Sequence, residues 1–150
     1  MLKHDLKIPD DRLRVMATDL RTFIGQLKRR LRQEADIGDL THSQTAVLLR
    51  LEKEGPTTVS KLARAEGVRS QSMGVTVAAL EQNGYVTGVP DATDKRQILI
   101  SLTEKCHQWM AEGRAAREDY LVRALHDRLD AQDLLELERL IPLLKRLVDA

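Results

Sequence analysis

Leucines recur at heptad spacing near the start of the chain, at Leu13, Leu20 and Leu27. Other apolar residues flank each of them, so a helix expected over residues 10–33 has a wide apolar stripe along one side. At 1.5 Å per residue this helix is about 35 Å long, which is more than a small helical core can cover. We therefore expect a second copy of the chain to cover the stripe.

The rest of the chain predicts a mostly α-helical protein. Helix signals delimit further helices over residues 41–55, 59–66, 70–83, 103–129 and 130–150. Thr41 and Gln44 have the spacing of a capping box, and Asp130 can cap the last helix. Pro142 lies inside that last helix and should kink it, because proline removes a backbone donor and crowds the preceding turn.

One segment breaks the helical pattern. Ile98, Ile100 and Leu102 fall on one side of an extended chain, which predicts a strand of period two. Gln97, Leu99 and Ser101 fall on the other side. Residues 84–89 are rich in β-branched and aromatic side chains and predict its partner. The tip of this hairpin carries Asp94, Lys95 and Arg96.

The order helix, short helix, turn, helix and hairpin is that of a winged helix-turn-helix. In this arrangement a tight turn holds one helix across another so that the second can enter a major groove. Here the turn begins at Gly67, which is free to adopt the positive φ that ends the preceding helix.

The helix expected over residues 70–83 has two contrasting faces. Met73, Val77 and Leu80 share one face with Thr76 and should pack inward. The opposite face is small and nearly uncharged, and it carries Gln71, Gly74, Val75 and Ala78. A solvated helix face usually carries lysine or glutamate, so this one indicates close approach to another molecule.

The net charge of the chain is only +1, although nucleic-acid-binding domains are often strongly basic. DNA binding would therefore depend on where the cations lie. No apolar run approaches the roughly 20 residues of a membrane span, and the N-terminus lacks the apolar block of a signal peptide. With one cysteine, the chain fits a reducing compartment. We expect a cytoplasmic protein without a membrane partner.

The sequence contains no pattern typical of an enzyme. It has no glycine-rich phosphate loop, no nucleophile elbow and no paired carboxylates on a recognisable scaffold. Its four histidines have no ligand spacing, so neither a metal nor another cofactor is expected.

Three segments together resemble the MarR family of bacterial transcriptional regulators: "LTHSQTAVLLRL", "TVSKLARAEGVRSQSMGVTVAALEQNGYV" and "DATDKRQILISLT". The resemblance is continuous over about residues 40–104. It implies one MarR-type domain over residues 1–150, with a winged helix-turn-helix over 40–103 and an intertwined helical dimerisation region over 10–38 and 104–150. It also implies a homodimeric repressor that binds double-stranded DNA at an inverted repeat and is released by a small molecule. Apolar residues expected between the subunits are Leu13, Leu20, Leu27, Leu134, Leu137, Leu140, Ile141 and Leu144.

The resemblance assigns DNA contacts residue by residue. Residues 70–83 would be the recognition helix, with Ser70, Gln71 and Ser72 at its N-terminal end and Gln71 as the candidate for pairing with adenine. Arg96 would reach the minor groove, braced by Asp94. The expected contacts with the DNA backbone are Lys61, Arg64, Arg69 and Lys95.

One departure from the family pattern lies in the middle of the recognition helix. Many members have a hydroxyl residue followed by arginine where this chain has Gly74 and Val75. More of the readout must then come from DNA shape, from the wing and from Val75 against a thymine methyl. Gly74 costs about 1 kcal/mol of helix stability relative to alanine, which suggests close approach of the backbone to the DNA.

Three alternatives remain open. The chain could be a dimeric protein-interaction module that kept the fold without binding DNA, and the wing cations would then only solubilise an edge strand. Cys106 could be a thiol-based redox sensor at a helix start, although packing is the commoner role of a lone cysteine. The resemblance also implies a small aromatic or phenolic effector near His42 and Trp109, two residues that could equally serve packing.

Overall fold

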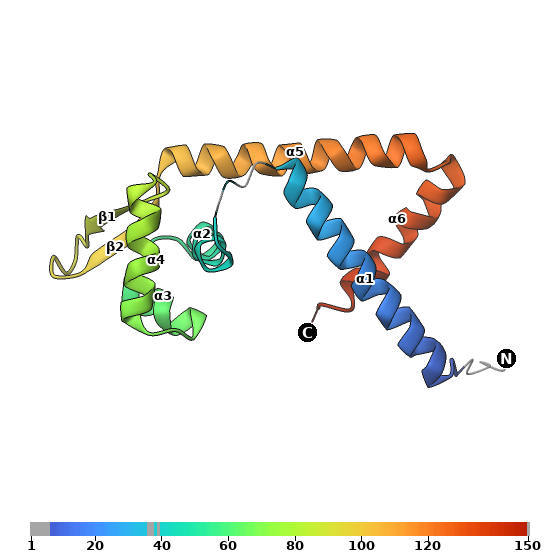
Figure 1. Cartoon of the computed structure of the whole chain (residues 1–150), viewed down its shortest axis with the longest axis horizontal. Helices are drawn as coiled ribbons and strands as arrows, with labels where there is room; N and C mark the ends of the chain where they lie inside the picture. The colour runs from blue at the N-terminus through green and yellow to red at the C-terminus, as the bar shows by residue number, and fades with distance from the viewer. Residues whose placement is uncertain (1–6, 36–37, 39, 150) are drawn as a thin grey trace. The chain divides into compact units, whose positions relative to one another are not determined.

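The computed structural model describes residues 7–35, 38 and 40–149. It contains the helices and hairpin expected from the sequence, in the expected order (Figure 1). The elements are α1 (Asp10–Glu34), α2 (His42–Glu54), α3 (Val59–Glu66), α4 (Ser70–Gln82), β1 (Val86–Pro90), β2 (Ile98–Leu102), α5 (Glu104–Arg128) and α6 (Ala131–Lys145). The predicted mostly α-helical fold with a two-stranded wing is confirmed.

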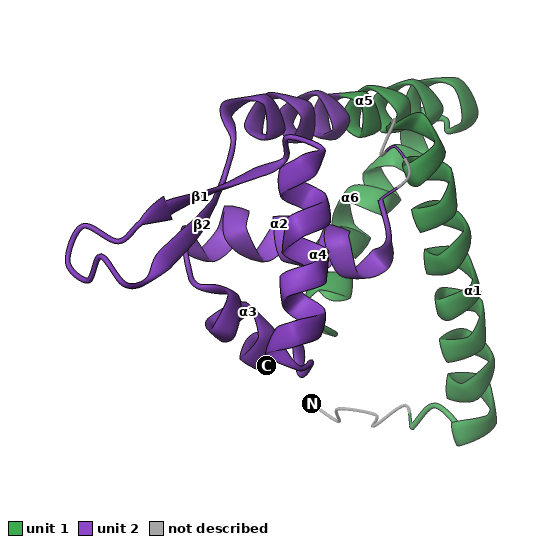
Figure 2. Ribbon diagram, turned by 60° about the vertical axis from the view of Figure 1, so that its left-hand side comes forward, with its two compact units in different colours: residues 1–36, 116–150 green, residues 37–115 purple. Residues whose placement is uncertain are grey.

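The chain divides into two compact units (Figure 2). Residues 37–115 form what we call the winged unit, and residues 1–36 with 116–150 form the helical unit. The boundary falls inside α5, so the first half of this helix belongs to the winged unit. The sequence had placed the boundary at the start of α5, near residue 104.

The core of the winged unit is an apolar cluster to which α2, α3, α4, both strands and α5 contribute. Met73, Val77 and Leu80 are all buried, as predicted for the inward face of α4. Burying each side chain of this size stabilises the fold by about 1.5–3 kcal/mol. The cluster comprises Leu40, Val47, Leu48, Leu51, Leu62, Ala63, Met73, Val77, Leu80, Val86, Ile100 and Cys106.

Local signals in the sequence set the helix ends of this unit. The backbone N–H of Gln44 donates to the Thr41 hydroxyl at 3.2 Å, and the N–H of Thr41 donates to the Gln44 side chain at 2.9 Å, which completes the predicted capping box. Gly67 adopts φ +67° and ends α3, as expected for a glycine in the left-handed conformation.

The wing is joined to the helices by backbone hydrogen bonds. The two strands are antiparallel, with Val86 opposite Leu102 and Pro90 opposite Ile98. Outside this sheet, Thr57 pairs with Ile100, because its N–H donates to the Ile100 carbonyl at 3.1 Å and its carbonyl accepts from the Ile100 N–H at 2.7 Å. This pairing ties the segment just before α3 to β2.

The helical unit buries little of its own apolar surface. Within α1, all of which is described, no residue is buried, although Leu20 and Leu27 are half-buried. The Arg30 guanidinium lies 5.0 Å from the centre of the Tyr120 ring, a contact between α1 and α5. Most of the apolar residues predicted to lie between subunits are exposed in the single chain, so their coverage by a partner stays a prediction.

The last helix follows its predicted start more closely than its predicted end. The N–H of Asp133 donates to the Asp130 side chain at 2.8 Å, so Asp130 caps α6 as expected. The helix continues through Pro142 and ends at Lys145, short of the predicted end at residue 150. None of the helices in the described part of the chain is both long enough and apolar enough to cross a membrane.

Candidate nucleic-acid interface

The outward face of α4 is exposed and carries no formal charge. Gln71 and Ala78 are exposed, and the Val75 side chain is among the most accessible apolar groups of the winged unit at 70 % exposure. A β-branched residue stabilises the helix little at such a position, because it lowers helix propensity and leaves most of its surface exposed. The predicted contrast between the two faces of α4 is therefore present in the structure.

Gly74 lies beside this face without any conformational need to be glycine. Its φ is not positive, and a Cβ placed on it would meet no atom of the described chain within 4 Å. Glycine at this point costs about 1 kcal/mol of helix stability relative to alanine. The packing around Gly74 within the single chain does not require glycine. The space beside Gly74 is available to another molecule.

The N-terminal end of α4 can accept an anion. Ser70, Gln71 and Ser72 are exposed there, as is Arg69, the residue that precedes the helix. Arg69 occupies the N-cap position of α4, and its side chain makes no capping hydrogen bond. The N–H groups of the first turn therefore stay available to an acceptor such as a phosphate oxygen.

A second set of cations lines a groove between α3 and the wing, which we call the α3–wing groove. It has a volume of about 400 Å³, and Lys61, Arg64 and Arg96 contribute three positive charges to it. Like charges gathered in one concave surface attract a polyanion, even on a chain that is nearly neutral overall. The groove is lined by Thr58, Ser60, Lys61, Arg64, Arg96, Gln97 and Ile98.

Asp94 positions Arg96 at the rim of this groove. One carboxylate oxygen of Asp94 accepts from the Arg96 backbone N–H at 3.1 Å and lies 3.5 Å from the Nε of the same residue. The Arg96 side chain as a whole is 93% exposed. Asp94 thus braces the arginine as expected, and the rest of the guanidinium can donate to a partner.

Thr58, at the start of α3, lines the α3–wing groove on the side of that helix. Its hydroxyl accepts from the backbone N–H of Lys61 at 3.2 Å and so caps α3. The sequence had singled out Lys61, Arg64 and Arg96 but not Ser60 or Gln97, which line the same groove. Gln97 could have been noticed because it directly follows the Asp-x-Arg motif, whereas Ser60 has no distinctive signal. Arg69 and Lys95 are exposed and lie outside the lining of the groove.

His42 and Trp109 have different surroundings in the described part of the chain. His42 lies at the start of α2 and borders a hollow of about 290 Å³, together with Ser43, Ala46, Glu66, Val68, Ser72, Met73 and Thr76. Trp109 is half-buried on α5 and packs against the core, where its ring centre lies 5.3 Å from that of Tyr85. Trp109 thus has a packing role beside the core, whereas His42 borders a hollow that polar side chains help to line.

Cys106 belongs to the core of the winged unit. It is fully buried, and this burial raises the pKa of its thiol, with a smaller contribution from the Glu52 carboxylate. A raised pKa disfavours the thiolate, which is the reactive form. These features favour packing over redox sensing. Among the described residues, no group of three or more His, Cys, Asp or Glu side chains could hold a metal ion.

A helix-turn-helix followed by a β-hairpin defines the class of winged helix-turn-helix proteins, and comparison with known proteins narrows the class further. The model of the MarR family matches residues 40–98. A helix-turn-helix transcriptional regulator of Mycobacterium tuberculosis is 34% identical over 110 residues, which are 73% of this chain and 77% of the mycobacterial protein. The chain belongs to the MarR family of transcriptional regulators.

Two crystal structures share the fold. One is of a Pseudomonas aeruginosa protein classed as a transcriptional regulator, with a TM-score of 0.81 and 33% identity, covering 95% of this chain and 99% of that one. The other is of a MepR variant from Staphylococcus aureus bound to an oligodeoxyribonucleotide, with a TM-score of 0.69 and 18% identity, covering 89% of this chain and 98% of that one.

Proposed function

We propose that the protein is a homodimeric repressor that binds an inverted-repeat operator and releases it when a small molecule binds. The observation that carries the DNA-binding part is the α3–wing groove, where Lys61, Arg64 and Arg96 meet in one anion-attracting surface. The uncharged outward face of α4 supports it, because base edges are read by amides and apolar groups as well as by cations. A MepR variant, which shares the fold, has a solved structure bound to an oligodeoxyribonucleotide.

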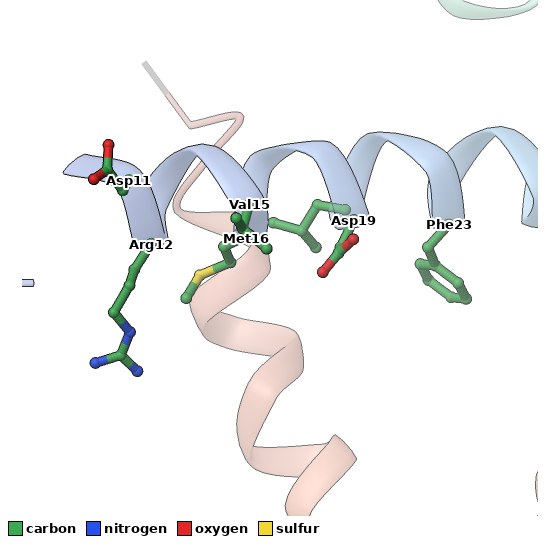
Figure 3. Close-up of a pocket in the computed structure, with 7 residues that line it drawn as sticks. Asp11, Arg12, Val15, Met16, Asp19 and Phe23 are labelled. Carbon is green, nitrogen blue, oxygen red and sulfur yellow. The ribbon is translucent and has the colours of Figure 1, made fainter. Parts of the chain in front are cut away.

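The homodimer is supported by the apolar surface of α1. One side of this helix borders an open hollow of about 660 Å³, and Met16, Phe23 and the polar residues Arg12 and Asp19 project into it (Figure 3). Phe23 is 54% exposed and Met16 is 49% exposed in the single chain. Contiguous apolar surface of this kind is typical of an interface, and a two-fold dimer buries the same patch on both copies.

The apolar residues of α6 support the same interface. Leu140, Ile141 and Leu144 are all more than a third exposed, although they recur at helical spacing along one side of the helix. In the proposed dimer, α6 and α1 of the two copies interleave and cover one another. The two recognition helices would then face successive major grooves on one side of the DNA.

Selection of bound sequences from a random pool of duplexes should return an inverted repeat. Its half-site centres should lie about 10 base pairs apart, because a two-fold dimer requires the same symmetry in its site. Sequencing of the bound fraction measures this directly. A direct repeat, or a pool without any consensus, would contradict the proposal.

Arg96→Ala and Gln71→Ala should weaken binding in different ways. Loss of the wing guanidinium should lower affinity for all sequences and reduce the slope of log K against log salt by about 1 per subunit. Loss of the Gln71 amide should instead relax the preference at one symmetric pair of operator positions. Titrations of operator and point-mutated operators at several salt concentrations separate the two effects, and parental behaviour of both variants would refute the assignments.

Phe23→Asp should dissociate the dimer and abolish tight operator binding. Phe23 is 54% exposed in the single chain, so the substitution costs less intrachain packing than a change at a buried residue, and it places an unpaired charge in the proposed interface. Thr22→Asp is the matched control, since Thr22 is exposed and lies about 100° around the helix from Phe23, away from the apolar stripe of Leu13, Leu20 and Leu27. Sedimentation should give a folded monomer for Phe23→Asp and a dimer for Thr22→Asp; a dimer in both cases would place the interface elsewhere.

The effector part of the proposal rests on the family resemblance. A small aromatic acid or phenol should quench Trp109 fluorescence and lower operator affinity over the same concentration range, because an inducer must bind the DNA-incompetent form more tightly. Cys106→Ser should keep both responses, given the burial of the thiol. If peroxide releases DNA from the parent but not from Cys106→Ser, the thiol is the sensor and the small-ligand proposal is wrong.

A further inference from the structure

We infer that α4 recognises thymine through its methyl group, with Val75 as the contact, and that each half-site places this thymine close to the adenine read by Gln71. The inference rests on the proposed DNA binding and adds what the bound sequence must contain. It names Val75 as a specificity-determining residue on the outward face of α4.

The exposure of Val75 is the first observation that supports the inference. At 70%, it is the most exposed large hydrophobic side chain among the described residues of the winged unit; Leu49, the next, is 53% exposed. Val75 lies on the helix that the proposed function places in the major groove, and most of its surface is open to a partner. Thymine is the one base whose major-groove edge offers a methyl group.

The neighbours of Val75 on the helix are suited to base edges rather than to phosphates. Gln71, Ala78 and Gln82 lie at positions i−4, i+3 and i+7, on the same side of α4, and all three are exposed. None is charged, so this side of the helix lacks the cations that attract phosphates most strongly. Two amides and two apolar groups can instead pair with adenine and pack against thymine.

Gly74 leaves room for this contact. A Cβ at this position would meet no atom of the described chain within 4 Å, and the φ does not require glycine. The absence of a side chain next to Val75 lets the helix backbone approach the base edges closely enough for the short valine side chain to reach a methyl group. A long side chain at residue 74 would hold the helix away from the groove floor.

The spacing along α4 limits where the thymine can be. Gln71 and Val75 are four residues apart, which is about 6 Å along a helix axis at 1.5 Å per residue. Successive base pairs are about 3.4 Å apart. We therefore expect the thymine within about two base pairs of the adenine that Gln71 reads.

Replacing thymine by deoxyuridine tests the contact, because it removes only the methyl group. Starting from the selected operator, each thymine of the half-site is replaced in turn, symmetrically in both half-sites, and affinity is measured for the parent, Val75→Ala and Leu49→Ala. One replacement should lower parent affinity about fourfold per half-site and about sixteenfold for the pair, the equivalent of one buried methyl at each site (about 0.8 kcal/mol).

The variants decide whether Val75 makes the contact. Val75→Ala should fold, since the residue is exposed and alanine favours helix, and it should bind the thymine and uracil operators equally. Leu49→Ala, a truncation at an exposed position of α2, should discriminate as the parent does. Gly74→Leu should weaken both operators while leaving the protein dimeric and folded.

Three results would overturn the inference while leaving DNA binding intact: a selected half-site without thymine, a uracil operator bound as tightly as the parent operator, or equal discrimination by parent and Val75→Ala. Failure to select any sequence would overturn the proposed function and this inference with it. The two failures are distinguishable because selection precedes the uracil replacements.

Discussion

The position of the wing depends on two backbone hydrogen bonds between Thr57 and Ile100, at 3.1 and 2.7 Å. They join the segment before α3 to β2. The hairpin is therefore held to the helix-turn-helix by this pairing as well as by its own chain connections. Thr57 precedes the capping residue of α3, and Ile100 is buried in the core. The pairing therefore fixes the distance between the cations of α3 and the cation of the wing, and the α3–wing groove exists because of it.

This arrangement explains how a chain with a net charge of only +1 can bind a polyanion such as DNA. Lys61, Arg64 and Arg96 are brought together from α3 and the wing, while the outward face of α4 stays uncharged. Affinity and sequence preference are thus assigned to different surfaces. In the proposed function, attraction to the backbone comes from the groove, and discrimination between bases comes from amides and apolar groups on α4.

The sequence predicted those parts of the fold that have local or periodic signals. The capping box at Thr41 and Gln44, the inward face of α4 and the left-handed Gly67 all have such signals, and all are present. The Thr57–Ile100 pairing was not predicted, because a single paired residue has no periodicity. For the same reason, no pattern in the sequence indicates that Ser60 and Gln97 share a groove, or that the first half of α5 packs with the winged unit.

We propose that cations gathered in one place, rather than a high net charge, make this protein bind DNA. Titration of a random-sequence duplex over a range of salt concentrations tests it most directly. If the three cations of the groove each neutralise a phosphate in both subunits of a dimer, log K should fall linearly with log salt with a slope of roughly −5. Absence of binding even at low salt would contradict the claim and favour an interaction module that kept the fold without DNA.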